Sequence, residues 1–288
     1  MKKSNNPLNF DSEKSAWVNE SFLPQNELDI ITEDISRNGY TVIENKLNKE
    51  DIQYSLKKVD EIYETQLKDC GGEKNLIDIG EQGIARNLLE YDDFFLKLIA
   101  HKDVIKILNF FLGDYYTLYQ FNGNLNIPNM PATSSPWHRD LTFRHFTSSR
   151  PISLTCIWVL DEWNEDNDGI TILPGTQKHD VFPSYEFIEK FKKKVYAKAG
   201  SIILLDGMVF HRSGFNKSNN RRRICQAMYT LPMISQQISI PRTLKGKYKD
   251  DPFLRNLLGY NNVQQSSPLE WRNEKLENKR KILKNITS

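Results

Sequence analysis

The spacing of apolar residues changes from a helical to a strand period about a third of the way along the chain. Between residues 26 and 113, apolar positions recur every three or four residues in QNELDIITEDISRNG, in the Asn48-capped NKEDIQYSLKKVDEIYETQLKD and in YDDFFLKLIAHKDVIKILNFFLG. YTVIEN, between the first two, predicts a short strand. We therefore expect residues 26–113 to be mostly helical, after a polar arm at residues 1–25.

Residues 114–240 instead alternate between apolar or aromatic and small polar positions. The segments are DYYTLYQFNGNLNIP, ISLTCIWVLDEW, GITILPG, GSIILLDG and RICQAMYTLP, each bounded by turn residues. Many short strands without helical crossovers favour an antiparallel sandwich or barrel. SYEFIEKFKKKV, residues 184–195, predicts one surface helix, and residues 241–288 a polar C-terminal extension that ends in a helix. No repeat or linker divides the sequence, so residues 1–288 are expected to form a single domain.

Composition narrows the class of protein. The 288 residues carry 39 basic and 37 acidic side chains, a near balance that argues against a nucleic-acid binder. Cys70, Cys156 and Cys225 lie far apart and form neither a zinc motif nor a complete disulfide set, which indicates a reducing cytoplasm. The sequence has no secretory leader pattern and no apolar run long enough to cross a membrane. The oligomeric state is left open.

The stretch SPWHRDLTFRH holds the first candidate for metal binding. His138 and Asp140 are two residues apart, so on an extended segment they point to the same side, as two ligands of one metal would. The alternative is a polar loop in which Asp140 caps a turn. His211 follows an apolar strand and an Asp-Gly turn, a position from which a barrel presents a ligand to its interior. Two histidines and one carboxylate match the facial triad of non-haem Fe(II) oxygenases, although His211 taken alone fits a core histidine bonded to a backbone carbonyl better.

Arg222 is the fourth candidate, eleven residues after His211 and at the start of an alternating strand. Pointing inward, its guanidinium could bind a carboxylate through two parallel hydrogen bonds. Arg221 and Arg223 flank it and, because strand neighbours face opposite sides, they are expected to belong to a solvated turn.

Taken together, these residues resemble the phytanoyl-CoA dioxygenase family of Fe(II)- and 2-oxoglutarate-dependent oxygenases. Four blocks carry the resemblance in the family's order: WHRD (137–140), CIWVLDEWNEDNDGITILPGTQK (156–178), AGSIILLDGMVFHRSGFNKS (199–218) and RRICQAMYT (222–230). The resemblance implies a mainly β fold, a double-stranded β-helix (jelly roll, cupin-like), with N-terminal helices packed on the barrel. This agrees with the helix-then-strand order of the sequence.

The resemblance also implies roles for individual residues. His138, Asp140 and His211 match the iron ligands, which are thereby the catalytic centre. Arg222 and Ser213 match residues that bind the distal carboxylate of 2-oxoglutarate, and Trp158 matches a tryptophan that lines the co-substrate pocket or packs in the core. The cofactors implied are Fe(II), 2-oxoglutarate and O2, with succinate and CO2 as products.

Two positions bear on how far the resemblance extends. Gln177 stands where the family motif P-G-[ST]-H has histidine, which leaves the triad intact but puts a hydrogen-bond network or the substrate wall in doubt. Asp140 is retained, whereas related halogenases have a small residue there, so hydroxylation is favoured.

The substrate is the least determined part of the prediction. Polar residues near the HxD segment are candidates for substrate contact: Asn122, Asn124, Thr142, Arg144 and His145. They favour a small hydroxylated metabolite, such as a sugar, an aminoglycoside-like compound or another natural product. Three alternatives stay open. They are an acyl-CoA hydroxylase with KFKKK (190–194) as phosphate patch, a non-catalytic cupin-like binding module, and a hydrolase or isomerase using Zn or Mn in the same triad.

Overall fold

The computed structural model describes residues 23–143 and 145–287. Most of the predicted N-terminal arm, and Arg144, therefore lie outside the described residues. The helices are α1 (Glu27–Asn38), α2 (Lys49–Asp69), α3 (Glu73–Asp78), α4 (Leu96–Ile99), α5 (Lys102–Leu112), α6 (Tyr185–Phe191), α7 (Ile240–Thr243), α8 (Pro252–Leu257) and α9 (Pro268–Thr287). The strands are β1 (Tyr40–Ile43), β2 (Ile84–Ala85), β3 (Thr117–Asn126), β4 (Ser153–Val159), β5 (Ile170–Ile172), β6 (Lys193–Val195), β7 (Ile202–Asp206), β8 (His211–Ser213) and β9 (Arg222–Thr230).

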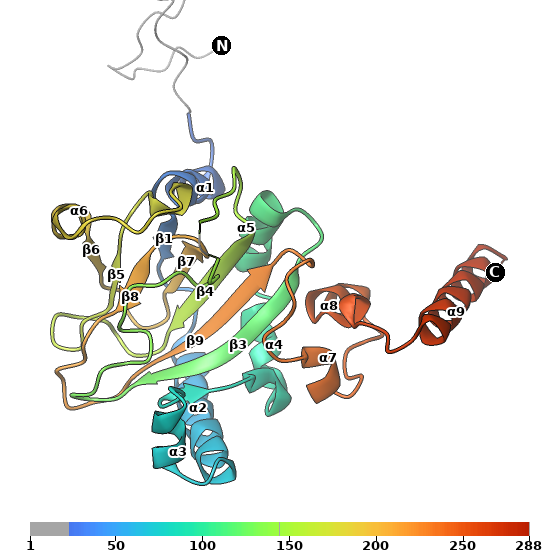
Figure 1. Cartoon of the computed structure of the whole chain (residues 1–288), viewed down its shortest axis with the longest axis horizontal. Coiled ribbons are helices and arrows are strands. Elements are labelled where there is room, and N and C mark those ends of the chain that lie inside the picture. Colours follow the sequence, from blue (N-terminus) through green and yellow to red (C-terminus); the bar gives the residue numbers. More distant parts are fainter. Residues whose placement is uncertain (1–22, 144, 288) are drawn as a thin grey trace, which may run out of the picture.

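The strands form two antiparallel sheets. The large sheet has six strands in the order β1-β7-β4-β9-β3-β2, and the small sheet has three in the order β6-β5-β8. Figure 1 shows the long strands β4, β9 and β3 side by side, with α2, α4 and α5 behind them. Every pairing among the described residues is antiparallel, as the sequence predicts, and none of these pairs closes the sheets into a complete barrel.

Alternation along each central strand gives the large sheet two different faces. In β4, Cys156 and Trp158 belong to the large core cluster that includes the helices, while Ile157 and Val159 belong to the cluster shared with the small sheet. Strand β7 divides in the same way, since Leu204 packs toward the helices and its neighbours Ile203 and Leu205 pack between the sheets. This two-residue period is the ordinary geometry of a strand buried on both sides.

Strand β3 carries an irregularity that decides which of its side chains face inward. Its pairing with β9 shifts between Leu118 and Gln120, so that Tyr119 is an extra residue on β3. Leu118 and Phe121 both pack toward the helices, although they are three residues apart. A β-bulge of this kind changes the phase of the alternation. As a result, the polar residues after it face away from the helices: Gln120, Asn122, Asn124 and Asn126.

Two helices begin and end where the sequence predicts. Asn48 caps α2, because its side chain accepts a hydrogen bond from the Asp51 N–H at 2.8 Å. Asn26 caps α1 in the same way, and Gly39 ends it with φ +80°. That conformation is left-handed, and a Cβ at Gly39 would also lie 2.7 Å from the Gln177 Oε1.

Two of the predicted helices were wrong in extent. The segment predicted as one helix from Tyr91 to Gly113 is divided at Ala100 and His101, because the His101 side chain caps a new helix, α5. The helix predicted over residues 184–195 ends at Phe191. Residues Lys193–Val195 instead form β6, because they pair with β5 and Val195 enters the core between the sheets.

Helix α9 confirms the predicted terminal helix and extends away from the rest of the chain (Figure 1). Among the described residues, no helix combines the length and apolarity needed to cross a membrane.

Candidate metal centre and its cavity

His138 and His211 lie opposite one another at the edge of the small sheet. The His138 N–H donates to the His211 carbonyl at 2.9 Å, and the His211 N–H donates back at 3.0 Å. In an antiparallel hydrogen-bonded pair of this kind, the two side chains emerge on the same face. The imidazole rings accordingly lie with their centroids 4.4 Å apart, although 72 residues of sequence, 139–210, lie between the two histidines.

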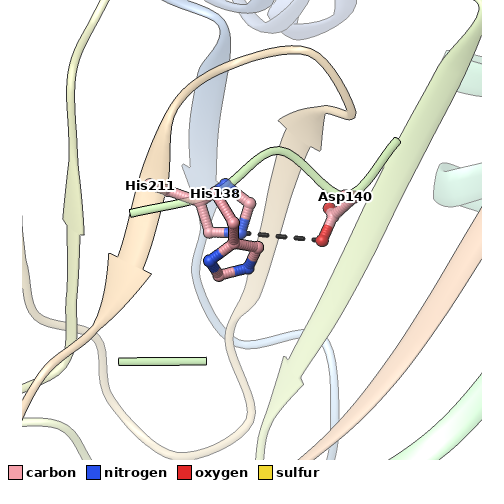
Figure 2. A group of neighbouring side chains, drawn as sticks. All are labelled: His138, Asp140 and His211. Carbon is pink, nitrogen blue, oxygen red and sulfur yellow. Dashed lines mark ion pairs between the residues drawn. The ribbon is translucent and has the colours of Figure 1, made fainter. Parts of the chain in front are cut away.

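Asp140 joins them because it lies two residues after His138 on extended chain. Its Oδ1 is 3.6 Å from the His211 Nε2, and Figure 2 shows the carboxylate directed at the two rings. One possible ligand atom from each residue lies within 4.8 Å of the others. The structure thus brings together the three predicted metal-binding residues from two separate segments.

The hydrogen bonds of the two imidazoles leave the same nitrogen of each available to a metal. The His138 Nδ1 lies 2.9 Å from the Pro136 carbonyl, and the His211 Nδ1 lies 3.1 Å from the Val209 carbonyl. Because a carbonyl only accepts, each Nδ1 carries the proton and each Nε2 keeps its lone pair. Burial, with His138 nearby, lowers the pKa of His211 against the opposing effect of Asp140, which favours the neutral ligand form.

The carboxylate of Asp140 is held from the large sheet. The Thr155 hydroxyl donates to its Oδ2 at 2.5 Å, and the Gln226 Nε2 donates to its Oδ1 at 3.5 Å. These contacts orient the carboxylate in the way that outer hydrogen bonds orient metal ligands. Two neutral imidazoles and one carboxylate are a donor set for Fe(II) with coordination positions left over. The residues present therefore fit the predicted metal.

The three residues open into a cavity of about 580 Å³ that Arg222 also lines. The Arg222 guanidinium is only 5% exposed and donates to the carbonyls of Asn167 and Gly169, each at 2.8 Å, and to the Ser213 Oγ at 2.7 Å. It also stacks 5.2 Å from the Trp163 ring. A Cβ at Gly169 would lie 2.1 Å from the Val195 carbonyl, so glycine lets the chain approach closely here.

Arg222 is a buried cation without a carboxylate bonded to it among the described residues. Burial lowers the pKa of Arg222 to about 10, opposed by the more distant charge of Asp168. Two buried polar atoms along this part of the cavity, the Asn126 Oδ1 and the Trp163 Nε1, have no hydrogen-bond partner in the described structure. Buried charges are normally paired, so this end of the cavity fits a small anion such as the distal carboxylate of 2-oxoglutarate.

The neighbouring arginines, Arg221 and Arg223, point away from the cavity, as strand alternation requires. The sequence predicted that they belong to a solvated turn, but both form ion pairs with α2. Arg221 lies 3.5 Å from Asp60 and from Glu64, while Arg223 lies 2.6 Å from Asp60 and 2.8 Å from Asp161.

Trp158 does not lie where the resemblance places it. It is fully buried on the helix-facing side of β4, where it packs edge-on against His101 at 5.2 Å between ring centroids. Ile157, its neighbour, is the residue of β4 that lines the cavity. The cavity tryptophan is Trp163, which the sequence analysis did not single out. The reason is the two-residue period of β4, which turns Trp158 away.

The predicted substrate-contacting residues divide into three groups. Asn122, Asn124 and Thr142 line the cavity, and their contact with a substrate stays a prediction. His145 is exposed with φ +56° and is not part of the lining, so the structure does not support it. Arg144 lies outside the described residues. Gln177, the departure from the family motif, is buried beneath the end of α1, with its Nε2 3.3 Å from the Ser36 carbonyl, and does not reach the cavity.

Sequence reasoning missed Thr155, Trp163 and Gln226. For Gln226 a signal was present, because residues 222, 224 and 226 of one strand share a face. Thr155 could not be found in this way, since the phase of β4 becomes clear only in the folded sheet.

A family model described as phytanoyl-CoA dioxygenase matches residues 35–224, more than half of the chain. The chain belongs to the phytanoyl-CoA dioxygenase family. It is therefore an Fe(II)- and 2-oxoglutarate-dependent dioxygenase with O2 as co-substrate, as the resemblance of the four motif blocks implied.

Two individual proteins to which this chain is similar are each about a quarter identical to it over the aligned residues. The uncharacterized protein Rv1501 of Mycobacterium tuberculosis is 25% identical over 223 residues, which cover 75% of this chain and 80% of that protein. A probable alpha-ketoglutarate-dependent hypophosphite dioxygenase of Stutzerimonas stutzeri is 24% identical over 210 residues, covering 64% and 72%.

Among solved structures, EctD from S. alaskensis, determined with 2-oxoglutarate and 5-hydroxyectoine, is similar with a TM-score of 0.57. It shares 18% identity and covers 76% of this chain and 80% of its own. This likeness confirms the predicted fold class, a mainly β double-stranded β-helix with helices packed on it. In this family member the two sheets remain an open version of that barrel.

Proposed function

We propose that this dioxygenase hydroxylates a C–H bond of a small, neutral, polar metabolite, releasing succinate and CO2. The observation that carries the proposal is one cavity whose lining holds two chemically different groups. The metal-binding cluster of His138, Asp140 and His211 opens into it, and the unpaired cation Arg222 lies within the same lining.

The roles of the residues follow from their contacts. His138, Asp140 and His211 would hold Fe(II), which, when bound, supplies the oxidation of the substrate at the expense of O2 and the decarboxylation of 2-oxoglutarate. Arg222 and Ser213 would bind the distal carboxylate and so orient the co-substrate toward the metal centre. Thr155 and Gln226 hold Asp140 in place. The task of the remaining wall is to position one C–H bond and to limit unproductive turnover.

Much of the remaining cavity wall supports a neutral substrate. Its polar groups include many amides and hydroxyls: Gln82, Tyr119, Gln120, Asn122, Asn124, Thr142, Gln226, Ser235 and Gln237. Two further arginines line the cavity, and both are engaged by the protein. Arg86 is paired with both oxygens of Glu81, at 2.7 and 2.5 Å, and Arg139 donates to the backbone carbonyls of Thr176 and His179. Hydroxyls and amides satisfy such a surface without the cost of burying an unpaired charge.

The acyl-CoA alternative finds less support. KFKKK spans the end of α6 and the start of β6, and none of its residues lines the cavity. Lys192 is paired with Glu189 at 2.6 Å, and Lys194 with Asp168 at 3.0 Å. The names of the relatives point the same way, since hypophosphite and 5-hydroxyectoine are both small polar molecules. The cytoplasmic location stays a prediction.

The proposal is tested by succinate release. Protein loaded anaerobically with Fe(II) is given 2-oxoglutarate and a candidate metabolite, and O2 is then admitted. The wild type should release succinate, and should show a weak visible absorption band when 2-oxoglutarate is added without O2. Asp140→Ala should lose both, while the control Asp166→Ala, on an exposed loop, should keep both.

Two outcomes would contradict the proposal. The absence of the band and of succinate with every candidate would exclude oxygenase activity. Purified protein that retains Zn or Mn and acts on a substrate without 2-oxoglutarate would instead favour a hydrolase or isomerase.

A further inference from the structure

Two short chains of amide side chains line the cavity wall formed by β3 and β9, and the direction of each chain is fixed at one end. The first begins at Asp140, whose Oδ1 accepts from the Gln226 Nε2 at 3.5 Å. A carboxylate can only accept, so Gln226 must turn its Oε1 away from it. That oxygen accepts from the Asn124 Nδ2 at 2.8 Å. The Asn124 Oδ1 is therefore left as an acceptor, with no hydrogen-bond partner among the described residues.

The second chain begins at the backbone. The Asn87 N–H donates to the Asn122 Oδ1 at 3.0 Å, and a backbone N–H can only donate. The Asn122 Nδ2 must then point the other way, and it donates to the Gln120 Oε1 at 3.2 Å. This leaves the Gln120 Nε2 as a donor on the cavity wall. Asn122 is only 4% exposed, so it fixes Gln120 from behind.

We propose that the Asn124 Oδ1 accepts a hydrogen bond from the substrate of this dioxygenase and that the Gln120 Nε2 donates one to it. We further propose that the substrate is a neutral polyhydroxylated molecule of the sugar or glycoside class. The inference rests on the proposed function and names its substrate class. Hydroxyl groups suit both positions, because one hydroxyl can donate to Asn124 and another can accept from Gln120. A carboxylate or phosphate dianion cannot donate to Asn124, and an ammonium group cannot accept from Gln120.

Gln226 is the positioning residue in this arrangement. It touches both Asp140 and Asn124, so it links the orientation of a metal-binding carboxylate to the group that meets the substrate hydroxyl. Without Gln226, nothing in the first chain prevents the Asn124 amide from rotating and presenting its Nδ2. The structure thus predicts that Gln226 sets a preference for hydroxyls over ethers at the Asn124 Oδ1.

The experiment uses a panel of neutral mono- and disaccharides, their methyl glycosides, and sugar phosphates and acyl-CoAs as charged probes. Stimulation of succinate release above the level without substrate identifies active probes. Each active sugar is then compared with analogues in which one hydroxyl is replaced by an O-methyl group, which accepts hydrogen bonds but cannot donate them. In the wild type, one such replacement should lower kcat/KM roughly 5-fold to 150-fold, because it leaves the Asn124 Oδ1 unpaired.

Three variants separate positioning from general damage. Asn124→Leu should raise KM for the active sugar and remove the difference between it and the O-methyl analogue. Gln226→Met, of similar shape, should reduce that difference as well when measured at saturating Fe(II), while the thermal unfolding midpoint stays near the wild type. Asn262→Leu, an exposed asparagine remote from the cavity, is the control and should retain the full difference.

Each outcome decides the question. Stimulation by sugars, with hydroxyl selectivity lost in Gln226→Met and Asn124→Leu, would support the proposal. Stimulation by charged probes alone, by none of the panel, or undiminished selectivity in both variants would overturn it. Failure of the proposed function is recognised separately, since the wild type would then show no visible band with Fe(II) and 2-oxoglutarate.

Discussion

The two faces of the six-stranded sheet differ in what their side chains do, although they alternate along the same strands. On the helix-facing side, β4 and β9 contribute Cys156, Trp158 and Tyr229, all fully buried in an apolar core. On the cavity-facing side, the same two strands contribute Thr155, which holds Asp140, and Arg222. Neighbouring residues of one strand therefore lie in different places, one in the apolar core and the next on the side of the metal site and its cavity.

This division implies that neighbouring residues of one strand contribute separately to the stability of this dioxygenase and to its ligand binding. Helix-facing substitutions should change the free energy of unfolding with little effect on ligand binding by the folded molecules. Cavity-facing substitutions should do the reverse. Each prediction below tests one side of this comparison.

The largest expected effect lies on the helix-facing side. Trp158→Ala removes a fully buried side chain and should lower the free energy of unfolding by about 3–5 kcal/mol. Chemical denaturation measures this, and 2-oxoglutarate titration of the folded protein should give an unchanged Kd. Trp158→Phe should cost much less, because the indole Nε1 has no partner here to lose. A large loss of 2-oxoglutarate affinity in Trp158→Phe would show that the tryptophan reaches the co-substrate after all.

Arg222→Ala is the corresponding change on the cavity-facing side. Removing the buried cation that would pair with the distal carboxylate should cost about 2–5 kcal/mol of binding, a roughly 30-fold to 5,000-fold rise in the Kd for 2-oxoglutarate. Calorimetric titration under anaerobic conditions measures it. Arg221→Ala and Arg223→Ala are matched controls that lose ion pairs with α2 instead. Equal effects from all three would mean that a different guanidinium binds the co-substrate.

Asp206, at the end of β7, is a buried carboxyl group outside the cavity lining, and it should make the free energy of unfolding depend on pH. Burial raises the pKa of Asp206 from 3.8 to about 6, so the folded protein holds this proton more tightly than the unfolded chain. The contribution of Asp206 to the free energy of unfolding should therefore be greatest below about pH 4. It should fall as the pH rises to about 6 and stay level above that pH. The shift corresponds to about 3 kcal/mol at most.

Asp206→Asn should remove that contribution, because the amide stays neutral while its Oδ1 can still accept from the Met208 N–H. Urea denaturation at a series of pH values compares the two proteins. The difference between variant and wild type should grow between pH 4 and 6. Parallel stability curves over that range would contradict the assignment.

The smallest effect concerns the support of the metal ligand. Thr155→Val keeps the shape of the side chain but removes the hydroxyl that donates to Asp140. Fe(II) affinity should fall roughly 10-fold to 100-fold, as is usual for residues that orient metal ligands. Competition with a chelator measures it, and the unfolding midpoint provides the control. Unchanged affinity would mean that Asp140 is held well enough by the chain around it.

Much of this architecture could be predicted from local pattern. Asn48 and the Asn-Gly pair mark helix ends, and the HxD spacing together with His211 identifies the metal cluster. The rest depends on contacts between distant segments. The orientation of Trp158 is set by which face of β4 the helices cover, and β6 replaces the end of a predicted helix because β5 offers it a partner. Neither fact is present in the local sequence.

The bulge at Tyr119 has a consequence for how this enzyme can change over evolutionary time. Because side chains alternate along β3 after the bulge, deleting one residue there, such as Phe121, would turn Asn122, Asn124 and Asn126 toward the helices. Three amides would then replace apolar side chains in the core, and the chain would not fold in this form. Deleting Tyr119 itself would only remove the bulge, since Leu118 and Gln120 already pair with consecutive residues of β9. Length along β3 after the bulge is thus closed to variation, while the identity of its cavity-facing residues can change by point mutation.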